Sequence, residues 1–132
     1  MDKRAMMGIG AIAVVIVITF GALILLSGST VTVDESQDGS TVEMSYGDTL
    51  ELKLVGNPTT GFNWQTTEVD DAILRQEGEP EFEPETELIG SKGVVTITYS
   101  AVGTGTTPLT LEYKPVAGGD VERIFSITVV VS

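Results

Sequence analysis

Cysteine and histidine are both absent from this chain of 132 residues. Without a thiol or an imidazole, the sequence excludes the usual catalytic pairs and triads, zinc sites with nitrogen or sulfur ligands, and disulfide bonds. An enzyme would have to work with carboxylates, hydroxyls and lysines alone. We therefore predict a protein that is not an enzyme, that carries no cofactor or metal, and that is held together by packing alone.

Basic residues are also scarce. Seven lysines and arginines stand against 19 aspartates and glutamates, which gives a formal net charge of −12. Nucleic acids and anionic lipid surfaces are bound through cationic faces, so this balance argues against either of them as the partner of the domain. The length allows one small domain, which we expect to be monomeric.

A single long apolar run lies near the N-terminus. Residues 5–26 contain no charged side chain, and as a helix they would extend about 33 Å, enough to cross a bilayer core of about 30 Å. Lys3 and Arg4 precede the run, so the positive-inside rule places the rest of the chain outside the cytoplasm. We predict that residues 1–28 are a cytoplasmic stub and a transmembrane helix that anchors an extracytoplasmic domain. Cleavage as a signal peptide near Ser27, which would release a secreted protein, is the alternative.

Beyond this run the hydrophobic pattern changes. Residues 29–38 are small, polar and acidic, a composition that is typical of a tether. Within residues 39–132, apolar side chains recur at every second position, as in strands with one buried face. The clearest alternations are Leu50-Leu52-Leu54, Phe62-Trp64-Thr66, Val95-Ile97-Tyr99, Leu109-Leu111-Tyr113 and Phe125-Ile127-Val129-Val131.

Turn-forming residues separate these segments at short intervals. Glycine, proline, asparagine and aspartate gather at residues 46–48, 56–58, 90–93, 103–105 and 117–120. About seven strands with such punctuation predict an all-β fold for residues 39–132, an immunoglobulin-like antiparallel β-sandwich with Trp64 at its core. Only residues 69–75 could form a short helix.

Two further patterns could carry chemistry of their own. Glutamate occupies every second position of residues 77–87, and an ideal strand would align these carboxylates as for calcium binding or acid catalysis. Pro80 and Pro84 interrupt such a strand, so we interpret the run as a solvated acidic connection. Ser91 and Lys92 are adjacent, but a lysine in a glycine-flanked turn is too well solvated to act as a base.

The most distinctive local segment is Gly-Asn-Pro-Thr-Thr-Gly-Phe at residues 56–62. Asn57 and Pro58 favour a turn, and Gly61 permits a positive φ before Phe62 enters the next strand. The residues alone indicate a stiff loop between two strands, and a purely structural turn is the simplest interpretation of them.

The same residues resemble the first signature of the chagasin-like inhibitors of papain-family cysteine peptidases. That signature is Asn-Pro-Thr-Thr-Gly-Phe followed two positions later by Trp, which is Trp64 here. A second signature, Gly-x-Gly-Gly, corresponds to residues 90–93, after the aliphatic pair Leu88-Ile89. A third, Arg-Pro-aromatic, corresponds to residues 114–116. The resemblance covers about residues 41–131.

The resemblance implies a reversible, non-covalent inhibitor in which three loops at one end of an immunoglobulin-like sandwich block the cleft of a papain-like cysteine endopeptidase. The peptidase-binding residues it implies are Asn57, Pro58, Thr59, Thr60, Gly61, Phe62, Gly90, Ser91, Lys92, Gly93, Lys114, Pro115 and Val116, with Thr59, Thr60 and Gly61 nearest the catalytic Cys/His pair. Lys92, Lys114 and Val116 replace the glycine, arginine and aromatic of the family, so we expect the first loop to dominate inhibition. A non-inhibitory adhesion or assembly module and a calcium-dependent acidic module are the competing hypotheses.

Overall fold

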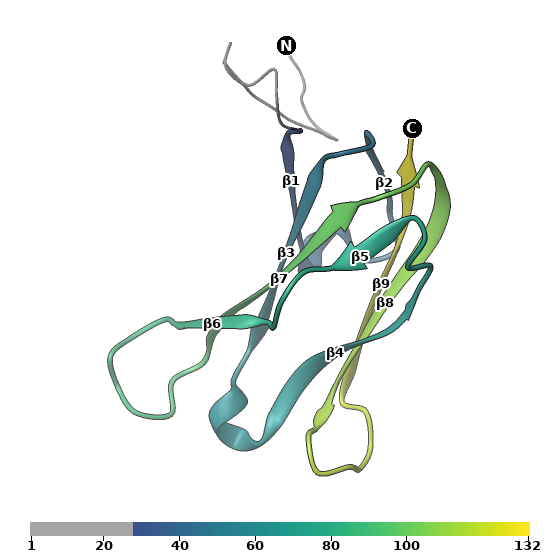
Figure 1. Ribbon diagram of the computed structural model, residues 1–132. Helices are drawn as coiled ribbons and strands as arrows, with labels where there is room; N and C mark the ends of the chain where they lie inside the picture. Colours follow the sequence, from purple (N-terminus) through teal and green to yellow (C-terminus); the bar gives the residue numbers. More distant parts are fainter. Residues whose placement is uncertain (1–27) are drawn as a thin grey trace.

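The structure is a computed structural model, and it describes residues 28–132 (Figure 1). Within these residues the chain forms nine strands and two 3₁₀ turns. The strands are β1 (Thr30–Asp34), β2 (Thr41–Met44), β3 (Thr49–Gly56), β4 (Phe62–Val69), β5 (Leu74–Gln76), β6 (Glu81–Pro84), β7 (Gly93–Ala101), β8 (Gly105–Pro115) and β9 (Arg123–Val131), and the turns are η2 (Glu35–Gln37) and η3 (Pro58–Thr60).

The helix predicted for residues 5–26 lies outside the described residues. In residues 28–132 no helix is long and apolar enough to span a membrane.

The strands form two sheets packed face to face. One sheet has the order β1-β3-β7-β5, with β6 also paired to β7, and the other has the order β2-β9-β8-β4. The inward side chains of both sheets join in one buried cluster, which includes Leu52, Ile97, Leu111 and Phe125. The predicted β-sandwich is confirmed, because each alternating segment became a strand with its apolar face inside. Trp64 is buried in this core, as predicted.

A polar contact also links the two sheets through the core. The buried hydroxyl of Tyr99 on β7 lies 2.8 Å from Thr66 Oγ1 on β4, and Thr66 donates to Gln76 Oε1 on β5 at 2.8 Å. Burial raises the pKa of Tyr99, while the hydrogen bond to Thr66 acts in the opposite direction. Because its polar atoms are paired, this buried network holds the sheets in one relative position.

The prediction of purely antiparallel sheets is wrong at two edges. β1 pairs with β3 in parallel, with Thr30 opposite Thr49, and β2 pairs with β9 in parallel, with Thr41 opposite Thr128. The turns after β1 and β2 each reverse the chain and carry it to the other sheet. Two reversals separate β1 from β3, so these strands run in the same direction, and β2 serves as their crossover connection.

The predicted acidic tether at residues 29–38 is also wrong. Its first half is the edge strand β1, in which Val33 is buried, and its second half contains η2. The Asp34 side chain caps this turn by accepting the N–H of Ser36 at 2.9 Å. The sandwich therefore begins at about residue 30 rather than at residue 39.

Two smaller predictions need correction. Residues 69–75 form no helix: the N–H groups of Ile73 and Leu74 both donate to the carbonyl of Asp70, and the chain then enters β5. The acidic run is not all connection, because residues 81–84 pair with β7 as the short strand β6. Pro84 ends that strand, as expected of a proline at an edge.

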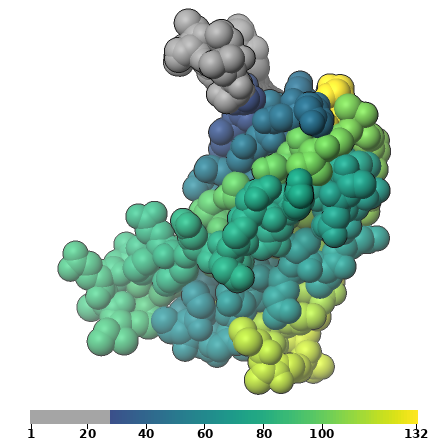
Figure 2. Space-filling model, viewed as in Figure 1, coloured from purple at the N-terminus to yellow at the C-terminus, as the bar shows by residue number. Residues whose placement is uncertain are grey.

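The loops divide between the two ends of the sandwich. The β3–β4, β6–β7 and β8–β9 connections gather at one end, and the C-terminus lies at the opposite end (Figure 1). The space-filling view shows the same three connections projecting beyond the sheets, with the β6–β7 connection reaching furthest to the side (Figure 2). This end of the molecule contains the segments singled out in the sequence.

Candidate functional site

The β3–β4 connection, residues 57–61, is here called the first loop. Asn57 caps η3: its Oδ1 accepts the Thr59 N–H at 3.2 Å, and its carbonyl accepts the Thr60 hydroxyl at 2.7 Å. Gly61 ends the turn at φ 87°, a left-handed conformation that disfavours a side chain, and its N–H donates to Pro58 O at 3.0 Å. Proline and these short-range hydrogen bonds leave the loop little conformational freedom.

The tip of the first loop is open to solvent. Thr59, Thr60 and Gly61 are exposed, whereas Phe62 turns inward and stacks on Tyr113 with ring centroids 5.4 Å apart. Among the predicted residues 57–62, Thr59, Thr60 and Gly61 therefore form the accessible part, and Phe62 anchors the loop to the sandwich.

The other two loops are joined to the first by direct hydrogen bonds. Asn57 Nδ2 donates to the carbonyl of Gly90 in the β6–β7 connection at 2.9 Å. The N–H of Val116, after β8, donates to the carbonyl of Gly61 at 2.9 Å. Residues that are more than 30 positions apart thus meet in one ridge, with the first loop in the middle.

The second loop, residues 85–92, joins β6 to β7. Ser91 closes it by donating through its hydroxyl to Thr86 O at 3.2 Å, and Gly90 adopts φ 84°. Leu88 and Ile89 project from it with relative exposures of 76% and 103%. Gly93 does not belong to the exposed part: it is buried in β7, where an added Cβ would lie 2.1 Å from Glu83 O.

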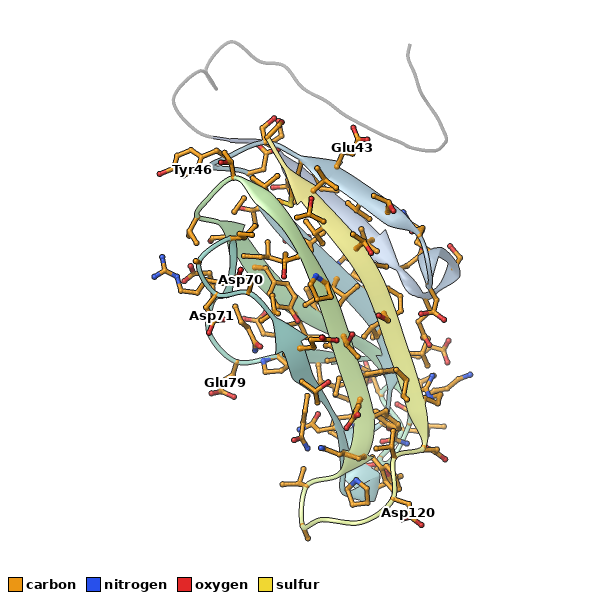
Figure 3. The ribbon with its side chains drawn as sticks, turned by 90° about the vertical axis from the view of Figure 1, so that its right-hand side faces the viewer. Glu43, Tyr46, Asp70, Asp71, Glu79 and Asp120 are labelled. Atoms are coloured by element: carbon orange, nitrogen blue, oxygen red, sulfur yellow. The ribbon has the colours of Figure 1, made fainter. Side chains whose placement is uncertain are left out.

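The third loop, residues 116–122, joins β8 to β9. Lys114 precedes it and forms a half-buried ion pair with Glu112, with 3.2 Å between Nζ and Oε1. Val116 is 66% exposed, next to the half-buried Pro115. Asp120, which belongs to this loop, is labelled in Figure 3 at the opposite end of the sandwich from Tyr46.

Three residues at the base of the site were not predicted. The Tyr113 hydroxyl accepts the Asn57 N–H at 2.8 Å, and the Arg123 guanidinium lies over the Tyr113 ring at 4.6 Å from its centroid. Arg123 Nη1 in turn lies 3.0 Å from Glu35 Oε2. Tyr113 could be found in the sequence only as a core residue, and no local spacing links residues 35 and 123.

The patterns considered for other chemistry are not assembled into a site. The hydroxyl of Ser91 is used in its hydrogen bond to Thr86, and Lys92 is exposed. Among residues 28–132, no group of acidic side chains is arranged to hold a metal ion. The glutamates of residues 77–87 follow an exposed edge, in keeping with the interpretation of a solvated segment.

Comparison with known families gives a clear match. The family described as Chagasin family peptidase inhibitor I42 matches residues 43–129. Chagasin from Trypanosoma cruzi is 31% identical over 84 residues, which cover 59% of this chain and 76% of chagasin. The match spans all three loops and both sheets.

Three solved structures share this fold, and one of them is a cysteine protease inhibitor. The cysteine protease inhibitor EhICP2 from Entamoeba histolytica superposes with a TM-score of 0.67 at 21% identity, covering 79% of this chain and 96% of EhICP2. Amebosin gives a TM-score of 0.63 at 25% identity, covering 80% and 98% of the two chains. PbICP-C, solved in complex with falcipain-2, gives 0.53 at 16% identity, covering 80% and 100%.

Proposed function

We propose that the three-loop end of this chain closes the active-site cleft of a papain-like cysteine peptidase. The chain belongs to the chagasin family of peptidase inhibitors. The chain is thus a cysteine protease inhibitor and not an enzyme. Family membership favours this function over a non-inhibitory adhesion or assembly module.

The observation that carries the proposed binding mode is the hydrogen-bonded ridge. The exposed Thr59-Thr60-Gly61 tip is held within its own turn and is tied to both neighbouring loops. A ridge that is already ordered loses little conformational entropy on docking, so a modest contact area can give tight binding. We infer that this tip lies nearest to the catalytic cysteine and histidine of the peptidase.

The flanking loops would contact the two sides of the cleft. Gly90, Ser91 and Lys92 lie on one side of the tip, and Lys114, Pro115 and Val116 lie on the other. Gly93 acts through the fold rather than by contact, because it is buried where β7 pairs with β6. Binding is non-covalent and reversible. A narrow turn whose backbone hydrogen bonds are made within the turn is a poor fit to the extended conformation in which a peptide is cleaved.

Two observations support this mode. PbICP-C has the same fold and was solved in complex with falcipain-2, which supports a peptidase as the partner. The sheet orders also support an immunoglobulin-like class: β1-β3-β7-β5 corresponds to strands A, B, E and D, and β4-β8-β9 to strands C, F and G. In that class the loops at one end of the sandwich form the binding surface.

We also propose that the inhibitor acts outside the cytoplasm, on the basis of the apolar residues 5–26 and the preceding Lys3 and Arg4. Mass spectrometry of the native N-terminus distinguishes an anchored chain from a cleaved one. An N-terminus between residues 27 and 30 would mean release, and an intact Met1 or Asp2 would mean retention.

Steady-state inhibition of papain by the full chain tests the proposed function. We expect reversible inhibition that competes with substrate, full recovery of activity after dilution, and no covalent adduct on papain by mass spectrometry. A trypsin-like serine peptidase serves as the control and should remain active. Papain and a cathepsin-like enzyme that both stay fully active at micromolar inhibitor would refute the proposal.

A further inference from the structure

The edge of β3 next to the first loop has no strand partner. β1 pairs with β3 only as far as Asp34 opposite Lys53, and the chain then leaves the edge through η2. Two residues further along β3, Val55 has its N–H and carbonyl on this open edge. Unpaired peptide groups at a sheet edge are a site of fraying, and Val55 lies just before the inhibitory loop.

Side chains take the place of the missing strand. The Val55 N–H donates to Glu35 Oε1 at 2.7 Å, and the Val55 carbonyl accepts from Arg123 Nη2 at 2.6 Å. Glu35 and Arg123 also bind each other through Oε2 and Nη1 at 3.0 Å. The indole N–H of Trp64 occupies the second acceptor position of the Val55 carbonyl at 3.0 Å. The backbone of Val55 is thus held at both its N–H and its carbonyl.

The Arg123 guanidinium also supports Asn57 indirectly, through Tyr113. Arg123 lies over the rings of Trp64 and Tyr113, 5.1 and 4.6 Å from their centroids, where a cation is attracted to an aromatic face. The hydroxyl of Tyr113 accepts the Asn57 N–H. Arg123 also begins β9, directly after the third loop. One side chain therefore connects the bases of the first and third loops.

We infer that Glu35 and Arg123 are positioning residues for inhibition: together they clamp the backbone N–H and carbonyl of Val55 and so set the direction in which the Asn57–Gly61 turn projects. This inference rests on the proposed function of that turn. Glu35 lies outside residues 43–129, the part that matches the family, so the acidic half of the clamp comes from the β1–β2 segment that precedes the matched region.

The test is a double-mutant cycle in the full chain, read as inhibition constants against papain. Arg123→Ala and Glu35→Ala should each raise the constant roughly tenfold, and the double variant should also cost about tenfold rather than a hundredfold, because either change opens the same clamp. The matched control is the exposed pair of Arg75 and Glu77 on the β5 side, 3.9 Å apart. Arg75→Ala should leave the constant unchanged.

Two further readouts separate positioning from general stability. Trp64 is the only tryptophan, so its emission should shift in Arg123→Ala and in Glu35→Ala but not in Arg75→Ala. Amide hydrogen exchange should accelerate in residues 55–61 while the central residues of β3 and β7 keep their protection. If Arg123→Ala unfolds, Glu35→Gln replaces it: the amide can still accept from Val55 but cannot pair with Arg123, and roughly a threefold loss is expected.

The outcomes decide between the two claims. Shifted emission and faster exchange with an unchanged inhibition constant would overturn the positioning role while leaving the inhibitory function intact. Additive losses from Glu35→Ala and Arg123→Ala would overturn the shared clamp. If the parent chain does not inhibit papain, the proposed function fails, and the exchange data on the free protein still show whether the clamp orders the loop.

Discussion

The first loop and its two neighbours present different kinds of surface to solvent. In the first loop, Asn57 and Pro58 direct hydrogen bonds within the turn, and only a short tip of threonine and glycine is exposed. The neighbours instead present apolar side chains to solvent, with Ile89 fully exposed and Val116 66% exposed. At the centre of the ridge the surface is therefore determined by the backbone conformation, and on the flanks it is determined by the exposed side chains.

This difference separates two contributions to binding. A rigid centre saves entropy on docking and fixes the distance of the tip from the reacting groups of the peptidase. Exposed aliphatic side chains on the flanks gain affinity only when they enter apolar hollows on a particular partner. Changes at the centre should therefore affect inhibition of every susceptible peptidase, while changes at the flanks should affect some peptidases and not others.

The largest effect is expected from adding a side chain at the centre. Gly61→Leu forces a leucine into φ 87° and adds bulk at the tip. We therefore expect the inhibition constant for papain to increase by roughly a hundredfold or more. Gly47→Leu is the matched control, since Gly47 has φ 90° and equally open surroundings but lies in the β2–β3 turn at the opposite end. Both variants should lose about 1–2 kcal/mol of stability from backbone strain, measured by denaturant unfolding. Equal loss of inhibition in both would show that strain, not position, matters.

A smaller effect is expected from cutting the tie between the centre and one flank. Asn57→Asp keeps the oxygen that accepts the Thr59 N–H but removes the donor to Gly90 O. We expect roughly a fivefold increase in the inhibition constant, against about twentyfold for Asn57→Ala, which also removes the cap. Asn63→Asp, with Asn63 in β4 behind the loop, is the control for the added charge. An Asn57→Asp variant that inhibits as well as the parent would mean that the second loop is positioned independently.

The sequence predicted the sandwich where the period of two was long. The segments around Leu52, Ile97, Leu111 and Ile127 bury one face each, and burial alone selects the strand and its orientation. The edge strands β1, β2, β5 and β6 escaped prediction because each is only three to five residues long, and their pairing depends on an edge that the folded sheet supplies. Whether these strands run parallel or antiparallel to their neighbours depends on how the turns carry the chain between the sheets. The pattern of apolar and polar residues does not contain this information.

The same distinction applies to the site. The turn at residues 57–61 could be predicted because asparagine, proline and glycine dictate backbone conformation within a few positions. The clamp of Glu35 and Arg123 could not, since it joins residues 88 positions apart and each looks like an ordinary surface charge in its own segment. Local chemistry identified the loop, and only the tertiary structure shows what supports it.

The smallest effects are expected at the tip of the third loop. Val116→Ala should raise the inhibition constant for papain by less than about threefold, because the side chain is 66% exposed and an exposed aliphatic side chain contributes little to the folded loop. Val116→Trp should lower the constant, up to about tenfold, if the flank contributes through apolar contact with the wall of the cleft. Ala117→Trp places the same indole one position further along the loop and should leave the constant unchanged. If Val116→Ala costs more than Gly61→Leu, the flanks dominate binding and the rigid centre serves only to hold them in place.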